Sequence, residues 1–194
     1  MLCFASNNDH KLSEVRALLG PDFPILSLRE IGCLEELPET RDTLEGNSLQ
    51  KADYVFSKYK VACFADDTGL EVEALNNAPG VYSARYAGNH KSSEDNIKLL
   101  LKNLEGVKNR DARFRTVITL VGMKQVQVFE GVVKGLIITE KKGSSGFGYD
   151  PVFLPHGSSK TMAEMDLNEK NRISHRAVAT AKLTAFIKQH PYSF

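Results

Sequence analysis

The sequence predicts a mixed α/β protein folded as one domain over residues 1–194. Short apolar runs typical of strands alternate with segments in which apolar residues recur at helical spacing, and this alternation is typical of α/β proteins. No internal repeat, low-complexity linker or change of composition divides the chain. A chain of 194 residues with 42% hydrophobic residues can fill one core but is short for two domains.

The N-terminal part predicts a strand, a polar turn and a helix. Residues 2–5 are apolar, residues 6–9 are polar, and the helical spacing that follows stops at Gly20-Pro21. A weaker strand is expected at 24–28, and apolar or small residues at helical spacing predict a second helix over 44–59. Residues 61–65 predict a buried strand that ends in a turn at Asp66-Asp67-Thr68-Gly69, because Asp and Gly favour turns. Residues 70–74 then alternate, and residues 78–81 indicate a further turn.

The C-terminal part predicts a polar helix over 93–102 and two long strands over 114–122 and 125–139. The two strands would be joined tightly at Met123-Lys124 as a hairpin. A glycine-rich loop follows over 141–150, then a strand over 151–154 and a last helix over 174–189.

Charge and cysteine usage exclude several classes of partner. The formal net charge is +1, so no basic field indicates a nucleic-acid partner. No apolar stretch approaches the roughly 20 residues of a membrane helix, and residues 1–6 show no signal peptide. The three cysteines include no Cys-x-x-Cys pair, which indicates buried, reduced thiols in a cytoplasmic protein.

The adjacent carboxylates Asp66 and Asp67 are the first candidates for chemistry. Neighbouring residues that leave a strand point opposite ways, so one of the two is expected to face a given site. Such a carboxylate can bind Mg²⁺ and accept a proton from water, although plain turn chemistry explains the pair equally well. Glu36 and Glu39 add acids in a loop that solvation alone would also explain. Lys51, on the helix over 44–59, is expected either to border a cleft or to extend into solvent.

Two segments are candidates for anion binding. Residues 6–11 place backbone N–H groups and Lys11 at a helix start, which favours a phosphate, whereas N-capping by Asn8 or Asp9 is the simpler explanation. In the loop over 143–150, glycines allow close backbone approach and two aromatic residues offer a stacking face, with a packed structural loop as the alternative.

The start of the last helix carries cations where stability alone would not place them. Ser174 is a plausible N-cap, so His175 and Arg176 fall in the first turn, where they oppose the helix macrodipole. Arg176 also lies on the apolar stripe of that helix and therefore requires a partner. Together with Lys170 and Arg172 it indicates a site for an anionic or hydrogen-bonding ligand, and a salt bridge to an acid is the alternative.

Several of these segments, in this order, resemble the inosine triphosphate pyrophosphatase family, also called dITP/XTP pyrophosphatases. The match extends over nearly the whole chain. The matching segments are Ser6-Asn7-Asn8-Asp9-His10-Lys11, Glu39 with Asn47-Ser48-Leu49-Gln50-Lys51-Ala52, Ala65-Asp66-Asp67-Thr68-Gly69-Leu70, Pro79-Gly80-Val81-Tyr82-Ser83-Ala84-Arg85-Tyr86-Ala87-Gly88, Gly146-Phe147-Gly148-Tyr149-Asp150-Pro151 and Ser174-His175-Arg176.

The resemblance implies a two-lobed α/β domain around a long mixed, twisted sheet flanked by helices, with the active cleft between the lobes. It implies hydrolysis of nonstandard purine nucleoside triphosphates (ITP, dITP, XTP) to the monophosphate and pyrophosphate, with Mg²⁺, by a homodimer. Asp67 would be the general base and a metal ligand, Lys51 a second catalytic residue, and Glu39 a further metal ligand. The implied substrate-binding residues are Ser6, Asn7, Asn8, Asp9, His10, Lys11, Thr68, Phe147, Gly148, Tyr149, Asp150, Lys170, His175 and Arg176.

Two positions depart from the family pattern. Thr68 stands where Ser is common and retains the hydroxyl, whereas Gly46 stands where many members have Glu. A nucleotide sensor that binds without hydrolysis is the alternative to the enzyme, and it would lack a working centre at Asp67 and Glu39. A buried donor such as Arg176 or His175 would favour a 6-oxo purine over adenine, because adenine would leave that donor unpaired.

Overall fold

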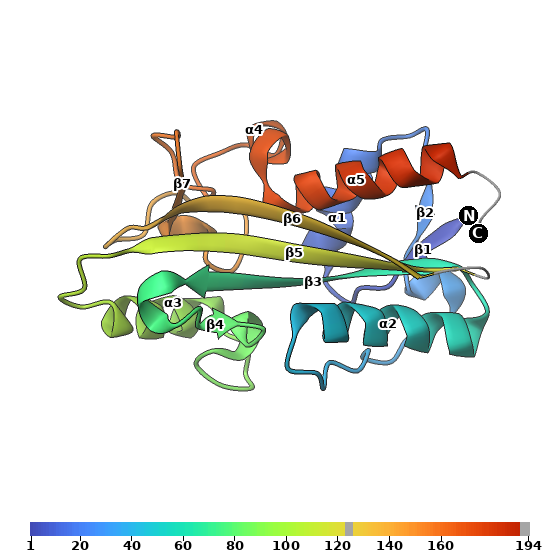
Figure 1. The fold of residues 1–194 in the computed structure, drawn as a ribbon, viewed down its shortest axis with the longest axis horizontal. Helices are drawn as coiled ribbons and strands as arrows, with labels where there is room; N and C mark the ends of the chain where they lie inside the picture. Colours follow the sequence, from blue (N-terminus) through green and yellow to red (C-terminus); the bar gives the residue numbers. More distant parts are fainter. Residues whose placement is uncertain (123–125, 191–194) are drawn as a thin grey trace. The chain divides into compact units, whose positions relative to one another are not determined.

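The computed structural model describes residues 1–122 and 126–190, and in these residues it contains seven β-strands and five α-helices (Figure 1). The α/β class predicted from the sequence is confirmed. The helices are α1 (Asp9–Leu19), α2 (Leu44–Tyr59), α3 (Ser93–Asn103), α4 (Leu167–Ile173) and α5 (His175–Gln189). The strands are β1 (Leu2–Phe4), β2 (Ile25–Leu26), β3 (Cys63–Val72), β4 (Pro79–Gly80), β5 (Asp111–Val121), β6 (Val126–Ile137) and β7 (Phe153–Pro155). None of the helices in the described ranges is long and apolar enough to cross a bilayer.

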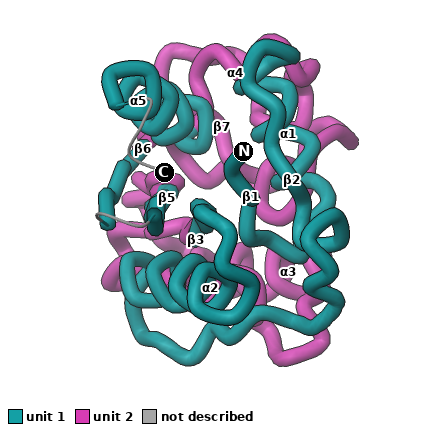
Figure 2. Tube along the Cα trace, turned by 90° about the vertical axis from the view of Figure 1, so that its right-hand side faces the viewer, with its two compact units in different colours: residues 1–67, 116–131, 175–194 teal, residues 68–115, 132–174 magenta. Residues whose placement is uncertain are grey.

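The strands form one mixed sheet in the order β2-β1-β3-β5-β6-β7, and β4 pairs with β3. β1 runs parallel to β2 and β3, whereas β4 is antiparallel to β3 and β7 is antiparallel to β6. The chain divides into two compact units (Figure 2). The first comprises residues 1–67, 116–131 and 175 onwards, and the second comprises 68–115 and 132–174. The single-domain assignment over 1–194 stays a prediction.

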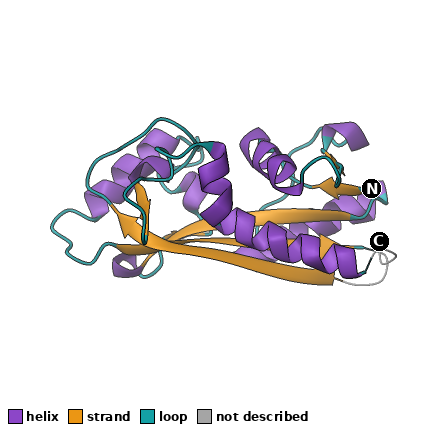
Figure 3. Ribbon diagram, turned by 90° about the horizontal axis from the view of Figure 1, so that it is seen from above, coloured by secondary structure: helices purple, strands orange, loops and turns teal. Residues whose placement is uncertain are grey.

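The first unit buries different side chains on the two faces of its strands. Because successive strand residues point to opposite faces, Phe4 and Phe64 stack on one face, with ring centroids 5.1 Å apart, while Cys3 and Cys63 lie on the other. Helices α1 and α5 pack on the phenylalanine face and α2 packs on the cysteine face (Figure 1). Figure 3 shows the last helix lying along the strands. Residues adjacent in β3 are therefore presented to different helices.

A glycine in β6 brings α5 close to the sheet. A Cβ built at Gly131 would overlap the carbonyl oxygen of His175 and the backbone nitrogen of Ala179. Only glycine permits this approach without displacing the helix. The first turn of α5, which carries Arg176, is thereby fixed against the strands.

The second unit has its own core of aliphatic and aromatic side chains, among them Phe114 and Phe153, whose ring centroids lie 4.7 Å apart. Tyr149 belongs to this core, and its hydroxyl donates to the carbonyl oxygen of Ser83 at 2.9 Å. The glycine-rich loop is thus anchored in the second unit by one of its own aromatic residues.

The turn predicted at Asp66-Asp67-Thr68-Gly69 is wrong, because β3 continues through these residues to Val72. Gly69 has a structural role within the strand, since a Cβ there would lie 2.6 Å from the carbonyl oxygen of Gly80 in β4. Close pairing with β4 thus overrides the local turn preference of Asp and Gly.

Other boundaries follow the sequence more closely. The helix predicted over 44–59 is confirmed at both ends, and the helix predicted over 93–102 extends by one residue. The strand predicted over 151–154 begins only at Phe153, after a 3₁₀ turn. Helix α4 was not predicted, although Asp166 and Glu169 form a capping box at its start. The connection predicted at Met123-Lys124 lies outside the described residues.

The three thiols, Cys3, Cys33 and Cys63, are unpaired and buried on the α2 side of the sheet. Burial disfavours the thiolate and raises the pKa of Cys3 and of Cys63 to about 12. At pH 8 each of these two thiols is then ionised in only about one molecule in ten thousand. We expect the native protein to resist a disulfide reagent such as DTNB at pH 8 and to release three equivalents of colour only in denaturant, with N-acetylcysteine as the reactive control. Rapid labelling of the native protein would contradict this expectation.

Candidate active site

Asp67 points from β3 towards α2 and contacts two of its side chains. Its Oδ2 accepts a hydrogen bond from Asn47 Nδ2 at 3.2 Å, and its Oδ1 lies 3.4 Å from Lys51 Nζ. Asn47 and Lys51 are four residues apart on one buried face of the helix, so a single helix supplies both contacts. Burial raises the pKa of Asp67, and this effect outweighs the opposing charges of Lys51 and Lys11. A carboxylate with a raised pKa and a fixed orientation is suited to accept a proton.

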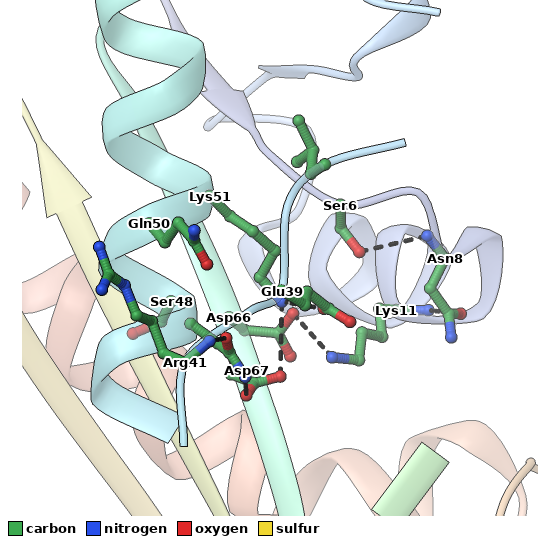
Figure 4. Close-up of polar contacts among 12 residues, drawn as sticks. Ser6, Asn8, Lys11, Glu39, Arg41, Ser48, Gln50, Lys51, Asp66 and Asp67 are labelled. Carbon is green, nitrogen blue, oxygen red and sulfur yellow. Dashed lines mark hydrogen bonds and ion pairs between the residues drawn. The ribbon is translucent and has the colours of Figure 1, made fainter. Parts of the chain in front are cut away.

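Lys51 joins Asp67 to Glu39. Its Nζ also donates to Glu39 Oε1 at 2.6 Å, and Figure 4 shows the three side chains converging. Burial alone would lower the pKa of Lys51, but the carboxylates of Asp67 and Glu39 raise it, so the ammonium stays charged. The two carboxylates predicted as metal ligands are thus brought together at one cationic group.

Asp66 points to the opposite face of β3, towards α1 and α5. Its Oδ1 accepts from Lys11 Nζ at 3.1 Å and its Oδ2 from Arg176 Nε at 3.1 Å. Arg176 Nη1 also donates to Glu14. Burial would raise the pKa of Asp66, but Lys11 and Arg176 reverse the effect and lower it. The expectation that the two aspartates face different surroundings is confirmed.

Arg176 forms buried ion pairs with acidic side chains, which was the alternative to ligand binding that the sequence left open for it. The side chain is 1% exposed and contacts the buried carboxylates of Asp66 and Glu14. His175, at the start of α5, is also buried. Their roles in substrate binding stay predictions.

The N-terminal turn is organised by its own polar side chains. Asn8 is the N-cap of α1, and its Oδ1 accepts from the backbone N–H of Lys11 at 3.1 Å. Ser6 Oγ accepts from the backbone N–H of Asn8 at 3.3 Å, whereas Asp9 and His10 are exposed on the first helical turn. Lys11 is the residue of this turn that reaches the carboxylate pair, through Asp66.

Of the other predicted substrate residues, Asn7 belongs to the first unit and bonds to the loop before Glu39, whereas the rest belong to the second unit, where three of them form a cluster. Asp150 Oδ2 accepts from the backbone N–H of Phe147 at 2.9 Å and from Lys170 Nζ at 2.7 Å. Lys170 Nζ also lies 5.0 Å from the centroid of the Phe147 ring. Gly148 has a φ of 60°, the left-handed conformation that favours glycine. Thr68 follows Asp67 in β3, and Tyr149 lies in the core rather than on an open stacking face.

Two residues of the first-unit site were not assigned from the sequence. Asn47 orients Asp67, and its position four residues before Lys51 was the available signal. Glu14 pairs with Arg176 and follows Lys11 by three residues, so the two share a helix face. Its partner lies 162 positions away, which no local pattern reveals.

The donor set on the α2 side fits a hard divalent cation. Asp67 and Glu39 supply carboxylate oxygens that converge on one ammonium, and Mg²⁺ is commonly held by one or two carboxylates plus water and phosphate oxygens. Lys11, Lys51 and Arg176 face four carboxylates (Glu14, Glu39, Asp66 and Asp67), so these seven side chains carry one negative charge in excess when ionised. No group of three or more metal-ligating side chains occurs in residues 1–122 and 126–190.

Gly46 is required by the neighbouring loop. It is the third residue of α2, after the N-cap Thr43, and a Cβ there would lie 2.7 Å from Arg41 Cβ. We expect Gly46→Glu to lower the free energy of unfolding by about 1–3 kcal/mol through overpacking. Arg41→Gly removes the nearest obstructing atom and leaves Thr43 Oγ1, at 2.9 Å, in place. In urea denaturation, the double variant should be about 1 kcal/mol more stable than the sum of the two single effects predicts. Strictly additive effects would contradict the contact.

The fold and this site together define an α/β enzyme with a carboxylate–lysine centre of the kind used for phosphate chemistry. The chain belongs to the Ham1 family, whose model matches residues 2–186. A dITP/XTP pyrophosphatase of Flavobacterium johnsoniae is 54% identical over 94% of this chain and 95% of its own, and one of Porphyromonas gingivalis is 53% identical over 96% of each. The resemblance seen in the motifs is thereby confirmed.

Solved structures agree with this membership. The Ham1 protein of Staphylococcus aureus superposes with a TM-score of 0.88 at 40% identity, and the match covers 97% of this chain and 98% of that one. A nucleoside-triphosphatase and dITP/XTP pyrophosphatase of Mycobacterium abscessus superposes with a TM-score of 0.76 at 40% identity, covering 94% and 97%.

Proposed function

We propose that this protein hydrolyses nonstandard purine nucleoside triphosphates, namely ITP, dITP and XTP, to the monophosphate and pyrophosphate, and so cleanses the nucleotide pool. The relatives that cover nearly its whole length are dITP/XTP pyrophosphatases. The observation that carries the proposal is the contact of buried Asp67 with Asn47 and Lys51, because it orients a proton acceptor beside a permanent cation.

In the proposed reaction, a water oxygen attacks the α-phosphorus and the bond from that phosphorus to the bridging oxygen of the β-phosphate breaks. Asp67 takes a proton from the attacking water, and its raised pKa suits this role at neutral pH. Lys51 offsets charge on the phosphoryl oxygens, and pyrophosphate leaves. Ser6 to Lys11 and Thr68 bind the triphosphate in this proposal.

Mg²⁺ is part of the proposal, with Asp67 and Glu39 as its protein ligands. When bound, the ion would neutralise phosphate charge and polarise the phosphorus–oxygen bonds. Lys51 contacts both carboxylates, so the ammonium would hold their orientation while the cation is exchanged.

The purine end is assigned to Phe147–Asp150, Lys170, His175 and Arg176. In the second unit, the cation of Lys170 is held by Asp150 next to the face of Phe147, an arrangement that supplies a donor, an acceptor and an aromatic surface. A buried donor would pair with a 6-oxo purine and would be left unpaired by adenine.

The test is pyrophosphate release with Mg²⁺ across ITP, dITP, XTP, ATP and GTP. The proposal expects release from the first three at a kcat/KM well above that for ATP, and no orthophosphate before pyrophosphate. Binding of ITP without release above an Asp67→Asn control would instead show a sensor. No observation favours the sensor, because Lys51 contacts both Asp67 and Glu39.

The proposal also includes a cytoplasmic homodimer that does not bind nucleic acid or membranes. The three unpaired cysteines suit a reducing compartment, and the net charge of +1 offers no field for a polyanion. The family resemblance supports the dimer, which light scattering coupled to size exclusion would measure.

A further inference from the structure

Two side-chain amides, those of Asn7 and Gln50, form hydrogen bonds to the loop that carries Glu39. Asn7 lies in the turn after β1 and bonds to the loop before Glu39. Gln50 lies on α2 and bonds to the loop after Glu39. The carboxylate of Glu39 is therefore held between two anchored points of the chain.

The Asn7 amide donates one hydrogen bond to the loop backbone and accepts another from it, as a residue of a neighbouring strand would. Its Nδ2 donates to the carbonyl oxygen of Glu35 at 3.1 Å, and its Oδ1 accepts from the N–H of Leu37 at 3.1 Å. The side chain of Leu37 is buried in the core on the α2 side, so Leu37 is held both through its backbone and through its side chain. Asn7 thus fixes the path of the loop two residues before Glu39.

The Gln50 amide bonds twice to the residue that follows Glu39. Its Oε1 accepts from the N–H of Thr40 at 3.0 Å, and its Nε2 donates to Thr40 Oγ1 at 2.8 Å. The next N–H, that of Arg41, donates to Asn47 Oδ1 at 2.9 Å, and Asn47 itself donates to Asp67. The backbone on the far side of Glu39 is thereby fixed to the helix that also orients Asp67.

We propose that Asn7 and Gln50 are positioning residues that hold the carboxylate of Glu39 at the divalent cation. The inference rests on the proposed function, in which Glu39 is a metal ligand. A ligand on a loop binds a cation tightly only if the loop is already ordered, because ordering costs conformational entropy. Asn7 therefore acts on Glu39 through the loop, and it links the turn over residues 6–11 to the metal side of the site.

The test compares Gln50→Met, which removes both bonds at similar size, with Thr40→Val and Thr40→Ser. Mn²⁺ affinity of the nucleotide-free protein is measured by electron paramagnetic resonance, together with hydrogen exchange of residues 35–41. Gln50→Met should weaken Mn²⁺ binding by about tenfold and speed exchange in this loop. Thr40→Val should show the same changes to a smaller extent, and Thr40→Ser, which keeps the hydroxyl, should restore wild-type behaviour.

Gln189→Met, at an exposed position at the end of α5, is the matched control and should leave Mn²⁺ affinity and loop exchange unchanged. In parallel assays with dITP, Gln50→Met should raise the Mg²⁺ concentration for half-maximal rate while kcat at saturating Mg²⁺ stays near that of wild type. A purely structural role would lower the melting temperature without this split.

Wild-type Mn²⁺ affinity in Gln50→Met would overturn the inference even if the enzyme is active. Weakened Mn²⁺ binding in a protein that releases no pyrophosphate would sustain the inference and refute the proposed function. A wild-type protein that binds no Mn²⁺ would overturn the role of Glu39, and the inference with it.

Discussion

Asp67→Asn is expected to lower kcat for pyrophosphate release from dITP by about a thousandfold, within the range that a positioned general base contributes. Asparagine keeps the shape and can still bond to Asn47, but it accepts no proton from water and is a poor ligand for a hard cation. Coupled detection of pyrophosphate at saturating Mg²⁺ measures the loss. The matched control is Glu36→Gln, an exposed carboxylate three residues before Glu39, which should leave kcat unchanged.

Stability should move in the opposite direction from activity in this variant. Burial raises the pKa of Asp67 in the folded protein, so at neutral pH the charged carboxylate costs folding free energy relative to the unfolded chain. A neutral asparagine removes that cost, and Asp67→Asn should unfold at the same urea concentration as wild type or a higher one. Loss of both activity and stability would mean that Asp67 is a structural residue.

Arg176→Met is expected to lower the free energy of unfolding by about 3–5 kcal/mol, the usual effect of removing one partner from a buried ion pair. The change leaves Asp66 and Glu14 buried without the guanidinium between them. Urea denaturation at pH 7 measures the effect. Arg16→Met is the control, because Arg16 pairs with Glu30 at the surface and its loss should change stability little.

The effect of Arg176→Met should depend on pH. In the wild type, Lys11 and Arg176 hold the pKa of Asp66 below its unfolded value of about 3.9. Their ion pairs with Asp66 therefore stabilise the fold fully above that pH, and this contribution is lost progressively as the pH falls from there towards the lower pKa of the folded state. The difference between wild type and variant should therefore be largest at neutral pH and smaller near pH 3. A loss of stability that does not change with pH would assign the effect to packing. The kcat/KM ratio for ITP over ATP, measured on the same variant, tests base recognition separately.

Regular spacing of apolar residues, together with residues that are neighbours in the sequence, was enough to predict much of the fold and part of the site. The helix over 44–59 could be predicted because its apolar spacing is regular, and the structure confirms it. The opposite directions of Asp66 and Asp67 could be predicted because strand side chains alternate between two faces. The strand through Asp66–Gly69 was not predicted, since it depends on pairing with β4. The burial of Tyr149 was not predicted either, since its core neighbours and its hydrogen-bond partner Ser83 come from other segments. Glu14, Asn7 and Gln50 have partners in other segments, so their contacts are properties of the folded chain and not of local spacing.

The division of Asp66 and Asp67 between the two faces of β3 ties their roles to the register of that strand. A strand side chain changes face with every one-residue shift, whereas both flanking strands and helices stay where they are. Deleting a single residue between 63 and 65 would place the carboxylate of Asp67 among the partners of Asp66, and Thr68 would take the place next to Lys51. Insertions and deletions should thus be far less tolerated here than conservative substitutions, because the number of residues before Asp66 in β3 decides which face of the strand each aspartate takes.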